Sequence, residues 1–94
     1  MTEATNRVTA ALAAHRVALA HVHALEDAPD RPAYDAAVEA ESAAMMALAR
    51  ASCADDDEFF IKVAYIVECM DQEPSIDDGA LAMAVRARLA ERAA

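Results

Sequence analysis

Alanine makes up more than a quarter of this 94-residue chain, and no other feature restricts its fold as strongly. Alanine is the strongest helix former because it loses no side-chain entropy on ordering. The chain has only one glycine and three prolines, so few residues oppose helix formation. We therefore expect an all-α fold, with residues 1–94 forming a single helical domain whose alanine-rich core is thin.

Two long helices are expected in the first half of the chain. Apolar residues recur at helical steps over about residues 5–26 and again over about residues 30–51. Pro29 separates the two segments, because proline cannot donate a backbone hydrogen bond and forces the residue before it out of helical space. Asp30 is the expected N-cap of the second helix. With so short a connection, the two helices should form a long antiparallel hairpin.

Two shorter helices should follow and pack against the hairpin as a small helical bundle. Asp55 and Glu58 have the spacing of a capping box, and residues 59–70 after them are apolar on nearly every helical face. Many of these residues also favour strands. We reject a strand because the chain offers no second strand to pair with its backbone groups. The last helix should be capped near Ser75 and carry an apolar stripe of Ile76, Leu81, Val85 and Leu89.

The charge of the chain restricts its partners. Seventeen acidic residues against eight basic ones give a net charge of −9, which repels nucleic-acid phosphates and anionic lipid headgroups. We expect neither nucleic acid nor a membrane as a partner. A basic protein partner is compatible with the charge, although a solubilising surface explains it more simply. We find no secretory signal and no charge-free run of about 18 apolar residues, so we expect a cytoplasmic protein with structural thiols at Cys53 and Cys69.

His15 and Glu41 interrupt two otherwise apolar helical stripes. In a hairpin that turns near Pro29, residues whose numbers sum to about 57 lie level, so His15 should face Glu41. Buried polar groups need hydrogen-bond partners, and we interpret this pair as a structural contact that fixes the register of the two helices. A general base or half of a metal site is the alternative. A metal site would need further ligands beside His15, but His21 and His23 lie about 120° and 80° away from it around the helix. We therefore predict no metal and no cofactor.

The chain shows no catalytic arrangement. The residues after His15 lack the Lys-Gly pair of histidine phosphotransfer proteins, and Gly79 is the only glycine, which excludes a glycine-rich phosphate loop. No Ser/His/Asp pattern indicates a hydrolase. We therefore expect no enzymatic activity.

The third segment also carries a candidate interface. A helix that is apolar all round is either the central helix of its domain or meets another protein on its remaining side. The large apolar side chains of this segment cannot all share one face, so some should be left for a partner. The candidate interface residues are Phe59, Phe60, Tyr65 and Ile66. We expect them to support a homodimer.

Two segments resemble parts of short all-helical bacterial proteins of unknown function. They are His15-Arg16-Val17-Ala18-Leu19-Ala20 and Phe59-Phe60-Ile61-Lys62-Val63-Ala64-Tyr65-Ile66. The family has a His-Arg pair in its first helix and a Lys-apolar-x-Tyr segment in its third, so the resemblance covers most of the chain. Val22 and His23 stand where aromatic residues often follow the pair. The resemblance implies a helical fold and supplies no activity.

These features together predict a small acidic protein-interaction or regulatory protein that acts as a homodimer. The alternative is a metal-binding or small-ligand-binding helical protein that uses His15 and Glu41.

Overall fold

The computed structural model describes residues 3–73 and 78–93 of the chain. They form four helices: α1 (Glu3–Leu25), α2 (Arg31–Arg50), α3 (Asp56–Gln72) and α4 (Gly79–Ala93). The described residues contain no strand, so the predicted all-α fold is confirmed, and so is the choice of helix over strand for the third segment. The cap expected at Ser75 lies outside the described residues.

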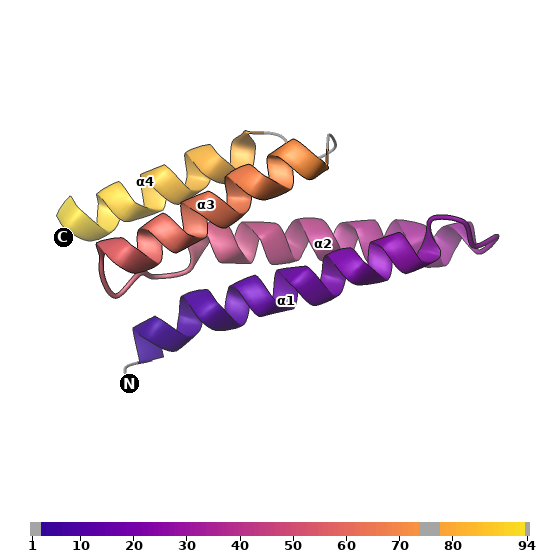
Figure 1. Ribbon diagram of the computed structural model, residues 1–94, viewed down its shortest axis with the longest axis horizontal. Coiled ribbons are helices and arrows are strands. Elements are labelled where there is room, and N and C mark those ends of the chain that lie inside the picture. Colours follow the sequence, from indigo (N-terminus) through magenta and orange to yellow (C-terminus); the bar gives the residue numbers. More distant parts are fainter. Residues whose placement is uncertain (1–2, 74–77, 94) are drawn as a thin grey trace.

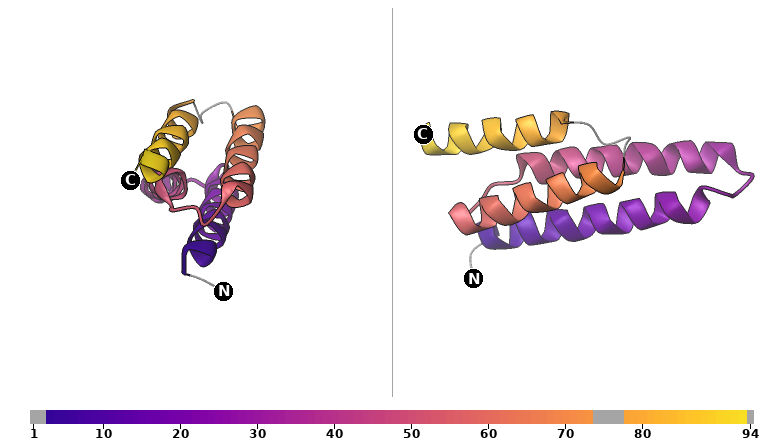
Figure 2. Two further views of the ribbon diagram at one scale, coloured as in Figure 1. Left: turned by 90° about the vertical axis from the view of Figure 1, so that its left-hand side faces the viewer. Right: turned by 45° about the horizontal axis from the view of Figure 1, so that its top comes forward.

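The four helices are arranged in two layers. The hairpin of α1 and α2 forms one layer, and α3 and α4 lie side by side on it (Figure 1). Viewed along the helices, α4 lies against α2 and α3 lies nearer α1 (Figure 2). The turn of the hairpin extends beyond the ends of α3 and α4, so this end of the hairpin has no second layer (Figure 1).

Side-chain caps begin α2 and α3 where the sequence places them. Asp30 Oδ1 accepts a 3.1 Å hydrogen bond from the backbone N–H of Ala33, and Asp55 Oδ1 accepts one of 2.9 Å from the N–H of Glu58. The carboxylate of Glu58 accepts from the N–H of Ala54 at 2.9 Å, one residue before the position expected for a capping box. Each cap satisfies backbone donors that have no partner inside the helix.

The core is small and rich in small side chains, as the alanine content predicts. Leu48 and Ile66 are fully buried at its centre. The buried residues around them come from all four helices and from the connection between α2 and α3: Val8, Met45, Ala49, Cys53, Tyr65, Cys69, Ala80 and Ala84. Because each buried CH₂ group contributes only about 0.8 kcal/mol, a core with this many alanines is held by close packing of helices more than by large side chains.

The buried face of α4 differs from the predicted stripe. Ala80 and Ala84 are the residues that this helix buries, whereas Val85 is 41% and Leu89 62% exposed. The prediction that Val85 and Leu89 face the core is therefore wrong. Small alanine side chains let α4 approach α2 closely, and this contact turns the larger side chains outward.

The stripe of α2 is buried only where the second layer covers it. Glu41, Met45 and Leu48 are buried as predicted, but Val38 is 36% exposed. Val38 lies closer to the turn of the hairpin, the end that extends beyond α3 and α4 (Figure 1). Its exposure therefore follows from the arrangement of the layers.

One segment of α1, Arg7–Leu25, is long and apolar enough to cross a membrane by length and composition alone. This segment is not a charge-free apolar run, because it contains Arg7 and Arg16. A single such helix is weak support for a membrane span, since a core helix of a soluble protein meets the same criterion. In this fold the middle of the segment packs on α2 and α3 through His15.

Candidate functional site

The two polar residues that the sequence places level in the hairpin are in direct contact. His15 Nε2 lies 2.7 Å from Glu41 Oε2. His15 is fully buried and Glu41 is 8% exposed. Each residue occupies the inward stripe of its helix, so the pair lies between α1 and α2 and not on the surface.

Tyr65 of α3 completes this buried polar cluster. Its hydroxyl oxygen lies 2.6 Å from His15 Nδ1, and the two rings meet edge to face at 85° with centroids 5.5 Å apart. Sequence reasoning missed this contact and assigned Tyr65 to an interface with another protein. Helical periodicity shows which residues share a face of one helix, but it does not show which residue of another helix they will meet.

Both nitrogens of the His15 ring are engaged within this cluster. Burial raises the pKa of the Tyr65 phenol well above its ordinary value, because the phenolate would lose its solvation. The phenol therefore keeps its proton. Both ring nitrogens of His15 have a hydrogen-bond partner, Nδ1 the Tyr65 hydroxyl and Nε2 the Glu41 carboxyl group. Neither ring nitrogen can bind a metal or accept a substrate proton without first breaking one of these hydrogen bonds.

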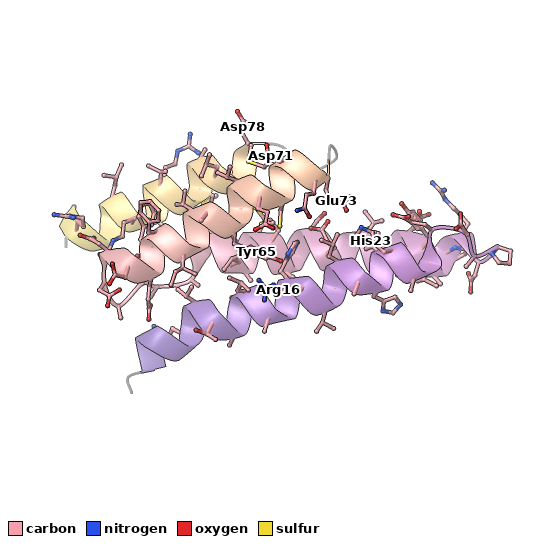
Figure 3. All side chains as sticks on the ribbon, viewed as in Figure 1. Arg16, His23, Tyr65, Asp71, Glu73 and Asp78 are labelled. Carbon is pink, nitrogen blue, oxygen red and sulfur yellow. The ribbon has the colours of Figure 1, made fainter. Side chains whose placement is uncertain are left out.

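Arg16 covers the same tyrosine from outside. Its guanidinium carbon lies 5.4 Å from the centroid of the Tyr65 ring, and Figure 3 shows the two side chains together where α1 passes α3. An exposed cation–π contact of this kind contributes about 0.5–1 kcal/mol. The neighbours His15 and Arg16 thus bind one tyrosine at two places, its hydroxyl and its ring face. This contact ties α1 to α3.

Lys62 is a second buried polar group, and sequence reasoning did not single it out. It is fully buried, and its Nζ donates to the backbone oxygens of Ala49 at 3.1 Å and Ala51 at 2.8 Å. Carbonyl groups at the end of a helix lack partners within the helix and carry the negative end of its dipole. Lys62 therefore caps the C-terminal end of α2. Its spacing from Glu58 and Tyr65, four and three residues, was the signal available in the sequence.

The two cysteines are free, buried thiols. Cys53 Sγ lies 3.9 Å from the Ala51 oxygen that Lys62 also contacts. Burial raises the pKa of the Cys53 thiol, although the nearby Lys62 charge acts in the opposite direction, and burial also raises the pKa of Cys69. A nucleophilic cysteine needs a lowered pKa. The surroundings of these thiols therefore do not favour covalent catalysis.

The described residues do not gather metal ligands. No group of three or more His, Cys, Asp or Glu side chains in residues 3–73 and 78–93 is placed to hold a metal ion. His21 is exposed. His23 Nε2 lies 2.6 Å from Glu73 Oε1, and this pair joins the later turns of α1 and α3 near the surface (Figure 3).

The four candidate interface residues lie in different surroundings. Ile66 is fully buried and Tyr65 is 9% exposed, so the chain's own core covers both. Phe59 is half-buried against that core, and Phe60 is 76% exposed. Of the four, Phe60 alone is available as a largely exposed side chain. Because α3 is apolar on nearly every face, its sequence did not show which face would turn outward.

Ion pairs between α3 and α4 show which sides of these helices face each other. Asp56 Oδ1 lies 2.9 Å from Arg88 Nη2 and 3.6 Å from Arg92 Nη1. At about 100° per residue, Phe60 and Val67 lie about 40° and 20° around α3 from Asp56. Both side chains therefore lie on the side of α3 that adjoins α4.

The matching positions on α4 are also apolar. Val85 lies about 20° and Leu89 about 60° around the helix from Arg92. The exposed fractions of the four side chains on the two helices are 76% for Phe60, 39% for Val67, 41% for Val85 and 62% for Leu89. We call Phe60, Val67, Val85 and Leu89 the α3–α4 patch. It lies along the outside of the second layer, away from the hairpin.

Comparison of the chain with protein-family models, with curated proteins and with solved structures gives no match. The geometry of the chain is therefore the basis for any statement about its function.

Proposed function

We propose that this protein is a small acidic interaction protein and that the α3–α4 patch is its docking surface for another polypeptide. The observation that carries this proposal is the exposure of four large apolar side chains, between 39% and 76%, along two adjacent helices. Small soluble domains rarely leave a contiguous group of such side chains in water, and where they do, it often marks a site of protein interaction.

The buried polar groups support the same proposal. His15, Glu41 and Tyr65 satisfy one another, and Lys62 satisfies the end of α2. Each group therefore has a structural role that is sufficient to explain its burial. Because both nitrogens of His15 have partners, the geometry does not favour the alternative of a metal or ligand site at His15 and Glu41.

A pull-down from an extract of the native host tests the proposal. The tagged protein should retain a polypeptide, either another protein or an untagged copy of itself. Leu89→Glu should lose most of that polypeptide, because a charge placed in the patch would have to be desolvated on binding. Ile61→Glu is the matched control and should retain it, since Ile61 is 55% exposed but lies about 140° around α3 from Asp56. Equal retention by the two variants would contradict the proposal.

A further inference from the structure

We propose that α4 opens away from the other three helices as a unit, and that Arg88 and Glu91 hold it closed over Cys53. The opening is a property of the single chain, so it does not depend on the proposed docking function. It makes the Cys53 thiol accessible while α4 is open and protects it while α4 is closed.

The apolar contact that α4 makes with the core is small. The side chains that this helix buries are Ala80 and Ala84, while Leu81 and Met83 are only half-buried against the core. In contrast, α2 contributes the fully buried Leu48. Hydrophobic stabilisation scales with the apolar area removed from water. An element with so little of it opens locally at a lower free energy than the whole domain unfolds.

Charged side chains in the later turns of α4 add a polar contact to the connection between α2 and α3. Arg88 Nη2 lies 2.9 Å from Asp56 Oδ1, and Arg88 Nη1 donates to the Cys53 backbone oxygen at 3.3 Å. Glu91 Oε2 accepts from the backbone N–H of Cys53 at 3.2 Å. The two side chains therefore bind the backbone of Cys53 at both its N–H and its carbonyl group. We call Arg88 and Glu91 the α4 clamp.

The α4 clamp is only partly satisfied in the closed form. Arg88 Nε and Glu91 Oε1 are buried and have no hydrogen-bond partner among the described residues. The side chain of Asp56, which pairs with Arg88, is 75% exposed, and water competes with so open an ion pair. Buried polar atoms without partners cost free energy that hydration restores. Opening of α4 relieves this cost.

The other three helices are joined by contacts in which α4 takes no part. His15 binds Glu41 of α2 and Tyr65 of α3, and Lys62 of α3 binds the backbone oxygens at the end of α2. These contacts stay intact when α4 leaves. The opening is therefore a local event within a chain whose remaining helices keep their arrangement.

Cys53 is the residue that the opening uncovers. It is 6% exposed, and the α4 clamp binds its backbone on both sides. Burial raises the pKa of its thiol, and the charges of Glu91 and Arg88 also act on that pKa, so the sulfur lies near α4. When α4 leaves, the thiol loses this cover. Its rate of reaction with a small alkylating reagent then reports the population of the open form.

Hydrogen exchange of single backbone amides, followed by NMR in the whole chain, tests the opening. In the wild type, the amides from Met83 to Ala90 should share one protection factor, about ten-fold or more below that of the central amides of α2. Arg88→Met should lower the protection of α4 several-fold further and leave that of α2 unchanged. Arg86→Met is the matched control, because it removes the same charge from an exposed position of the same helix, and it should leave α4 as in the wild type.

Two results would overturn the opening. One is equal protection of α4 and α2 in the wild type. The other is protection that falls gradually towards the end of α4, as in fraying. Both measurements use the chain without a partner, so a failure here is distinct from a failure of the docking proposal, which the pull-down tests.

Alkylation with iodoacetamide, located by peptide mapping, tests the link to Cys53. Cys53 should be alkylated several-fold faster in Arg88→Met than in the wild type or in Arg86→Met, in step with the loss of protection of the α4 amides. An unchanged rate at Cys53 in a variant whose α4 amides have lost protection would overturn the role of α4 as the cover of this thiol.

Discussion

The buried face of α3 carries more polar groups than the buried face of α2. On α2 the core side carries Met45 and Leu48 with one buried carboxyl group, that of Glu41, and exposed polar residues such as Asp35 and Glu39 lie on the solvent side. On α3 the core side carries Lys62 and Tyr65 beside Ile66, while the large side chains Phe60 and Val67 are exposed. Tyr65 has its partner in α1, Lys62 at the end of α2, and Glu58 in the backbone before α3.

This difference shows that polar contacts, as much as apolar ones, determine which face of α3 turns toward the core. An ammonium and a phenol that are matched to specific hydrogen-bond partners can occupy the core, because leaving them unpaired there would cost more than exposing an apolar side chain. The apolar residues displaced from the core side then lie on the surface, where a partner can cover them. The inner face holds the fold together, and the outer face leaves Phe60 and Val67 exposed.

The largest expected effect is from Lys62→Met. This change keeps the length of the side chain but leaves the Ala49 and Ala51 oxygens without the hydrogen bonds that Lys62 donates. We expect the free energy of unfolding in urea to fall by about 3 kcal/mol, because each unsatisfied buried carbonyl costs about 1–3 kcal/mol. Arg50→Met, at the exposed end of α2, is the control and should change it by less than about 0.5 kcal/mol. Equal losses of stability in the two variants would mean that the buried lysine of α3 contributes no more to the fold than an exposed arginine of α2.

A smaller effect is expected from Tyr65→Phe. The change removes the hydroxyl that is hydrogen-bonded to His15 Nδ1 and leaves a buried ring nitrogen unpaired, so stability should fall by about 1–2 kcal/mol. Tyr34→Phe is the matched control, because the Tyr34 ring lies beneath Arg31 near the start of α2. It should be close to neutral. An imidazole chemical shift of His15 that is unchanged in Tyr65→Phe would contradict the hydrogen bond itself.

The smallest effect is on the pH dependence of stability. Burial raises the pKa of Cys53 and Cys69 above the ordinary value of 9.0 in the folded chain. Their contribution is therefore complete below pH 9 and is lost as the pH rises from there towards the folded pKa, because the unfolded chain releases these protons first. We expect a loss of a few tenths of a kcal/mol for each thiol at pH 9 relative to pH 7, measured by urea unfolding. Cys53→Ser together with Cys69→Ser should flatten this slope.

Sequence reasoning predicted the hairpin and its polar contact because both depend on short-range rules. Pro29 and Asp30 mark the turn, and a short turn fixes which residues of α1 and α2 lie level. The contact between His15 and Glu41 could therefore be predicted from their residue numbers alone. Tyr65 and Lys62 could not be assigned in this way, since their partners lie 50 and 11 to 13 residues away in helices whose relative positions no turn rule fixes.

The sequence by itself determined four helical segments, the caps of α2 and α3, and most of the inward faces of α1 and α2, because alanine propensity, proline and capping side chains act over a few residues. Only the tertiary structure decided that α3 turns Lys62 and Tyr65 inward and that α4 buries Ala80 and Ala84 in place of Val85 and Leu89. These orientations depend on how closely two helices can approach and on which buried polar groups find partners. Both conditions involve pairs of distant residues, and a helical period alone does not encode them.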